Sequence, residues 1–105
     1  MSLSKAVKGA RHSPQRITWK KSDGMAYDLT GATITARIKN KVTGQIRAAD
    51  GGFAIVTATS GIFDWTYGSN DVKEAGEFEV QFIASYSDDK NDKTFIEEWI
   101  VEDTL

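Results

Sequence analysis

The most restrictive feature of this sequence is a long alternation of apolar and polar side chains over residues 77–86, which follow a turn that ends in Ala75-Gly76. Apolar residues recur at every second position, and Glu77, Glu79 and Gln81 stand between them. Successive side chains of a β-strand point to opposite faces of its sheet, so this period of two buries one face and leaves the other in water. The segment therefore predicts a long strand in a sheet with one solvated face.

Shorter segments carry similar patterns, and glycine-containing turns such as residues 23–24 and 50–52 separate them. We expect further strands over residues 16–20, 27–29, 33–39, 45–48, 53–58, 62–67 and 94–102. Residues 71–75 are expected to form a short helical turn at most. Seven or eight short antiparallel strands with regular turns indicate an all-β fold, an immunoglobulin-like β-sandwich.

The chain length of 105 residues fits a single domain. Residues 1–14 are small, polar and basic, show no periodicity, and end in a Ser-Pro pair that disfavours helix. We therefore expect a flexible basic arm over residues 1–14, followed by the sandwich domain over residues 15–105.

The sequence contains no cysteine, which excludes disulfides, thiolate metal sites and thiol catalysis. Stability must then come from packing, and aromatic side chains can supply it. Trp19, Trp65 and Trp99 fall on predicted strands beside Ile, Phe and Val, which favours a place in the core or in a subunit interface. The alternative is that they are exposed and stack on sugar rings, as in a carbohydrate-binding module.

Catalysis has little support in the residues present. The only histidine, His12, lies in the predicted arm, where no partner would hold its imidazole in place. Residues 88–92 offer oxygen ligands for calcium, but lysines interrupt them and the glycine and distal glutamate of an EF-hand are missing. The sequence therefore predicts a protein that is not an enzyme and has no cofactor or metal.

The charges are unevenly distributed along the chain. Residues 1–21 hold six basic residues and no acid, whereas eleven acids and three lysines follow residue 69. This contrast predicts an interface in which the arm of one copy contacts the acidic late strands of a neighbour. The residues expected there are Lys5, Lys8, Arg11, Arg16, Glu77, Glu79 and Gln81. The acidic body argues against nucleic acid as the partner.

The sequence shows no address for a membrane or for export. It contains no run of about 20 apolar residues, and its N-terminus lacks the apolar centre of a secretory signal. We therefore expect neither a membrane span nor secretion.

Three segments in their order and spacing resemble a pattern found in tailed phages. They are residues 27–34 (YDLTGATI), 57–63 (TATSGIF) and 75–82 (AGEFEVQF). Over about residues 17–101 the chain is similar to the immunoglobulin-like N-terminal domain of phage baseplate upper proteins and to related small tail proteins. The third segment also resembles the immunoglobulin tyrosine-corner strand, with Phe78 at the Tyr position and Val80 at the Cys position.

The resemblance implies a structural role with no catalytic residues. The chain would be an assembly module of a phage or prophage tail or baseplate, which binds other tail proteins or copies of itself as a homo-oligomer or part of a larger assembly. It would be located in the virion after assembly in the host cytoplasm. The alternative function is a carbohydrate-binding sandwich that recognises host-surface glycans through exposed Trp and Tyr.

Overall fold

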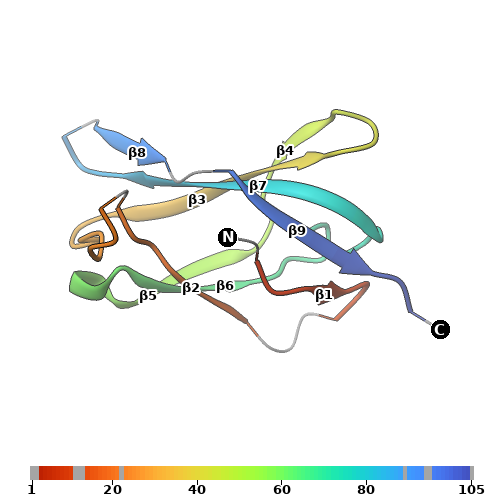
Figure 1. Ribbon diagram of the computed structural model, residues 1–105, viewed down its shortest axis with the longest axis horizontal. Helices are drawn as coiled ribbons and strands as arrows, with labels where there is room; N and C mark the ends of the chain where they lie inside the picture. Colours follow the sequence, from red (N-terminus) through yellow and green to blue (C-terminus); the bar gives the residue numbers. More distant parts are fainter. Residues whose placement is uncertain (1–2, 11–13, 22, 89, 94–95, 105) are drawn as a thin grey trace.

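Two β-sheets form two layers in the computed structural model, which describes residues 3–10, 14–21, 23–88, 90–93 and 96–104 (Figure 1). The larger sheet has the order β1-β9-β7-β3-β4, with β8 also paired to β7, and the smaller sheet has the order β2-β6-β5. The strands are β1 (Ala6–Val7), β2 (Gln15–Thr18), β3 (Thr33–Asn40), β4 (Ile46–Ala48), β5 (Gly52–Thr57), β6 (Ile62–Thr66), β7 (Gly76–Ser85), β8 (Asn91–Lys93) and β9 (Glu97–Glu102). The all-β prediction is confirmed.

The long strand predicted over residues 77–86 is β7, which begins and ends one residue earlier and lies in the middle of the larger sheet. β7 pairs antiparallel with β3 over the full length of β3, from Thr33 opposite Ser85 to Asn40 opposite Phe78. Its other side pairs with β9 in its first half and with β8 in its second half. The apolar positions of β7 are buried and the positions between them are not, as the alternation predicts.

Aromatic side chains fill the space between the two sheets. Trp65 on β6 and Trp99 on β9 are fully buried, and their ring centroids are 4.8 Å apart. Phe63 on β6 packs edge-on against Phe82 on β7 at 5.3 Å. Large apolar side chains removed from water contribute on the order of 2–3 kcal/mol each, so this cluster is a main source of stability in a chain without disulfides.

Several elements differ from the sequence-based expectations. Residues 27–29 form no strand, because the Asp28 carboxylate accepts hydrogen bonds from the amide and hydroxyl groups of Thr30 and closes a local turn. The polar residues 91–93 form β8, and residues 71–75 form turns without a helix. The helical element of the described chain, the three-residue 3-10 turn η1 (Ala58–Ser60), is far too short to cross a membrane.

The N-terminal residues are part of the larger sheet. β1 runs parallel to β9, and Ala6, which is buried, lies opposite Val101. The amide groups of Leu3 and Lys8 donate hydrogen bonds of 2.8 Å to carbonyl groups of β9. The sequence places these residues in an arm outside the domain, whereas the structure places residues 3–8 along β9. The sequence did not predict β1, because a two-residue strand is too short to show a period. The pairing of β1 with β9 is also parallel, whereas the predicted strand pairs were antiparallel.

Substitution of Ala6 tests the docking of β1. We expect Ala6→Glu to lower the free energy of unfolding by about 1–3 kcal/mol, because the new carboxylate would be buried at a site with 5% exposure. Residues 3–10 should then be cut faster by trypsin at Lys5 and Lys8. Val7→Glu is the matched control, since Val7 is 44% exposed. Equal trypsin cleavage of the two variants would contradict the docking of β1 on β9.

Candidate functional site

One face of the larger sheet is exposed to solvent and combines apolar side chains with charges of both signs. Alternation decides which residues lie on it: Ile38 of β3 points into the core, and its neighbours Arg37 and Lys39 point outward. We call this surface the outer face. Its residues include Arg37, Lys39, Ile46, Ala48, Glu77, Glu79, Gln81, Ile96 and Glu98.

The strand register arranges most of these residues in two rows across the sheet. In the first row Lys39 on β3 lies between Ile46 on β4 and Glu79 on β7, and Glu98 on β9 follows Glu79. Neighbouring strands are about 4.8 Å apart, so the row spans roughly 14 Å. It passes from an apolar side chain through a cation to two carboxylates.

The second row lies one outward position further along the strands. Arg37 on β3 lies between Ala48 on β4 and Gln81 on β7. Glu97 pairs with Val80 in an antiparallel register. Ile96 precedes Glu97 and therefore lies at the level of Gln81, on its far side from Arg37. This row therefore has apolar side chains at both ends and polar ones in its middle.

A shallow groove of about 130 Å³ crosses both rows. Ile46 and Ile96 stand at its two sides with exposed fractions of 64% and 61%. Exposed apolar side chains of this size, framed by charges, are typical of surfaces that bind other proteins.

The charges at the centre of the outer face are free of ion pairs with other described residues. Lys39 and Glu79 are direct cross-strand neighbours, yet neither forms a salt bridge, and the same holds for Arg37 and Glu77. Glu98 at the margin pairs with Lys41 at 3.7 Å. The central cations and carboxylates therefore remain available to a partner.

Within one chain the seven predicted interface residues lie on different surfaces, and the predicted contact between two copies stays a prediction. Glu77, Glu79 and Gln81 lie on the outer face, but the cations beside them come from β3 and not from the N-terminal residues. Lys5 pairs at 3.3 Å with Glu102 of the same chain, and Lys8 follows β1 at the sheet edge. Arg11, like His12, lies outside the described residues.

Arg16 lies on the other sheet. Its guanidinium on β2 donates hydrogen bonds of 2.9 and 3.2 Å to both carboxylate oxygens of Asp64 on β6. These hydrogen bonds and the positive charge hold the pKa of the Asp64 carboxyl below its ordinary value. Arg16 is therefore paired within its own chain, on the sheet opposite the one that carries Glu77 and Glu79.

The three tryptophans considered for glycan binding are core residues. Trp19 is 5% exposed, and Trp65 and Trp99 are fully buried. Stacking on a sugar ring requires an exposed face of the indole, so these residues do not form the row that a carbohydrate-binding module needs. The prediction that they pack in the core is confirmed.

Two partly exposed tyrosines at the β8 end of the larger sheet are also occupied within the chain. Tyr27 stacks on Trp19 with ring centroids 4.7 Å apart, and its hydroxyl donates a hydrogen bond to the Asp92 carboxylate. The Tyr86 hydroxyl donates to the Asp28 carbonyl at 3.0 Å. Burial raises the pKa of Tyr27, so the phenol stays protonated and keeps its role as donor. These contacts tie a loop to the sheet.

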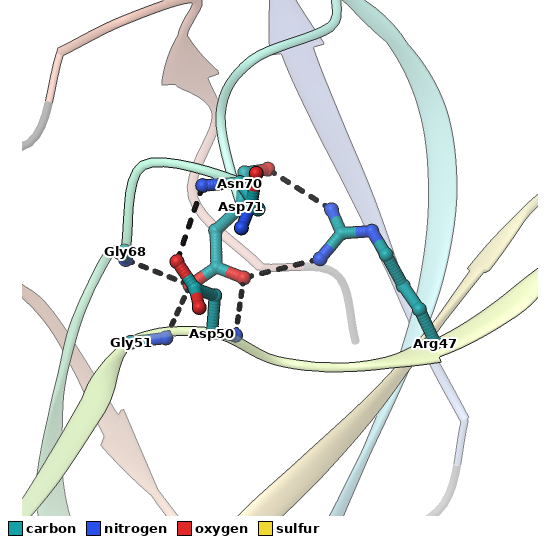
Figure 2. Close-up of polar contacts among 6 residues, drawn as sticks. All are labelled: Arg47, Asp50, Gly51, Gly68, Asn70 and Asp71. Carbon is teal, nitrogen blue, oxygen red and sulfur yellow. Dashed lines mark hydrogen bonds and ion pairs between the residues drawn. The ribbon is translucent and has the colours of Figure 1, made fainter.

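The sequence reasoning missed a buried carboxylate that joins two loops (Figure 2). The Asp71 side chain is fully buried and accepts hydrogen bonds of 2.7–2.8 Å from the amides of Asp50, Gly51 and Gly68. The Arg47 guanidinium, from β4, adds an ion pair of 3.2 Å. A Cβ on Gly51 would collide with the backbone, so glycine is required there. The glycines at positions 51 and 68 were the available signal, because close backbone approach needs them.

All acceptor directions of the Asp71 carboxylate are used in holding the β4–β5 and β6–β7 connections together. We expect Asp71→Asn to lower the free energy of unfolding by about 3 kcal/mol, because an amide nitrogen would face backbone donors and Arg47 would lose its counter-charge. Urea unfolding measures the loss. Asp103→Asn is the control, since Asp103 is exposed and its carboxylate accepts a hydrogen bond from the Thr104 amide. A loss no larger than that of the control would refute this role.

A second carboxylate, that of Glu97, is partly buried. Glu97 opens β9 on the same side as Trp99, and its Oε2 atom is buried and has no hydrogen-bond partner among the described residues. Burial raises the pKa of Glu97 above its ordinary value. The folded state therefore favours the protonated acid, and stability falls as the pH rises from the ordinary pKa through the raised one.

Replacement of Glu97 by glutamine should remove this pH dependence. We expect Glu97→Gln to be more stable than the wild type at pH 8, where the wild-type carboxylate is charged, and the gain to vanish below about pH 4. Thermal unfolding at both pH values measures the difference. The adjacent, exposed Glu98→Gln should show no such gain. A Glu97→Gln gain that persists at low pH would show that charge is not its cause.

Within the described part of the chain, no three His, Asp or Glu side chains gather in a way that could hold a metal ion. The outer face combines two exposed isoleucines with central charges that form no ion pair to other described residues. No protein-family model matches the sequence, and no curated protein is similar to it.

Proposed function

We propose that this chain is a non-enzymatic assembly module of a phage or prophage tail or baseplate, with an immunoglobulin-like sandwich that acts through protein contacts. The resemblance over about residues 17–101 supports the tail context. Two features of the molecule support the remaining parts of the proposal, namely the strand order and the outer face.

The strand order supports an immunoglobulin-like sandwich. In such domains one sheet has the order B-E-D and the other the order G-F-C, extended by C′ in variable-type members. The orders β2-β6-β5 and β9-β7-β3-β4 correspond to these strand by strand. The parallel strand β1 then extends the larger sheet beyond β9.

The observation that carries the functional proposal is the exposure of Ile46 and Ile96 on the outer face. A monomeric sandwich gains nothing from two isoleucines that are more than 60% exposed on one groove. Covered by a partner, each would contribute roughly 1–2 kcal/mol to the contact. The charges between them would fix the orientation of that partner.

Incorporation into tail particles tests the proposal. The chain, produced from its own genome with an affinity tag, should be found by peptide mass spectrometry in tails or tail-like particles purified on a density gradient. Ile46→Glu combined with Ile96→Glu should reduce incorporation about tenfold or more, because an unpaired charge in an apolar contact costs on the order of 1–3 kcal/mol.

The control for this experiment is Val42→Glu, at the tip of the β3–β4 hairpin. Val42 is 86% exposed and does not line the groove, so its substitution introduces the same charge elsewhere. This variant should enter particles as the wild type does. A wild-type chain that is absent from the particle fractions would overturn the proposed function.

A further inference from the structure

We infer that the outer face binds the same face of a second copy of the chain, in a symmetric dimer whose two-fold axis runs parallel to the strands between β3 and β7. This inference deepens the proposed function, on which it rests for its context, because it names the partner and the surface. The observation behind it is that the outer face is complementary to itself in charge and in apolar content.

The strand register provides the geometry of the contact. A two-fold axis along the strands keeps each residue at its level and exchanges the two sides of the sheet, so that β3 of one copy lies over β7 of the other. Lys39 then faces Glu79 of the second copy, because the two residues are cross-strand partners at one level. Arg37 likewise faces Gln81 of the second copy. Symmetry produces each contact twice.

The apolar residues at the margins meet in the same arrangement. Ala48 and Ile96 stand at opposite ends of the second row, so the axis places Ala48 of one copy over Ile96 of the other. Ile46 lies over Glu98 of the second copy and diagonally adjacent to its Ile96. The aliphatic stem of a glutamate covers apolar surface while its carboxylate stays in water. Two shallow grooves thus close over four exposed isoleucines.

Charge selects this axis over the other face-to-face arrangement. A two-fold axis across the strands would place β3 over β3 and β7 over β7. With this axis at the level of the first row, Lys39 would oppose Lys39 and Glu79 would oppose Glu79. With the axis midway between the two rows, Lys39 would oppose Arg37. Like charges in contact repel each other, whereas opposite charges fix the register of an interface.

Paired charge reversals test the dimer by analytical ultracentrifugation at low ionic strength. The wild type should dimerise, and 0.5 M salt should weaken it because the Debye length falls to about 4 Å. Lys39→Glu alone and Glu79→Lys alone should each weaken self-association about tenfold or more, since each reverses two symmetric contacts. A 1:1 mixture of the two variants should form heterodimers, because every Glu then faces a Lys. The double variant should dimerise as the wild type does.

The control uses the same reversals on the smaller sheet. Arg16→Glu and Asp64→Lys alter a pair that lies outside the outer face, so neither the single variants nor their mixture should change association. Circular dichroism shows whether each variant is folded. Ile46→Glu should also abolish dimerisation, and Val42→Glu should leave it intact.

The possible failures are distinct. A wild type that stays monomeric at millimolar concentration in low salt overturns this inference. If the variant with both Ile46→Glu and Ile96→Glu still loses incorporation into particles in that case, the proposed function stands, and a different protein binds the outer face. A dimer that is indifferent to the Lys39 and Glu79 reversals also overturns this inference, because the contact must then lie elsewhere. If the two charge-reversal variants form heterodimers but the wild-type chain is absent from purified particles, the dimer is supported and the tail function is overturned.

Discussion

The packing of Trp65 against Trp99 is the contact on which the rest of the structure depends, because it joins the two sheets in a chain with no cysteine. Trp65 comes from the central strand of the smaller sheet and Trp99 from β9 of the larger one. Tyr67 packs on both rings, with centroid distances of 4.8 and 5.5 Å. Aromatic pairs of this kind add about 0.5–1.5 kcal/mol each to the area they bury.

The periphery is built onto this core by polar contacts. Asp71 ties together two loops at one end, and Tyr27 and Tyr86 tie a loop to the sheet at the β8 end. β1 adds to the exposed edge of β9 and shields it, as edge strands require. These contacts hold both ends and one edge of the larger sheet, whose strands β3 and β7 present their outward side chains to solvent.

The residues of the outer face were only partly predictable from the sequence. The alternation correctly assigned Glu77, Glu79 and Gln81 to the solvated face of β7. The sequence analysis assigned the complementary cations to the N-terminal residues, because a sequence shows the distribution of charge along the chain but does not show which residues are neighbours across strands. Register puts Lys39 beside Glu79, although forty residues separate them in the sequence. Lys5 and Arg16 meet acids of their own chain. The outer face therefore could not be predicted as a unit.

The sequence by itself determined the β class, the course of β7 and most of the turns, because these depend on local periodicity and on the backbone preferences of glycine and asparagine or aspartate. It favoured burial of the tryptophans over exposure, and the structure decided between the two. Only the tertiary structure decided the partner of β1, the buried role of Asp71 and the charge pattern of the outer face. Each of these joins segments that are distant in sequence, and the relative position of such segments is set by how the two sheets pack and by the register of their strands. A one-residue change of that register would have reversed every side chain on the face.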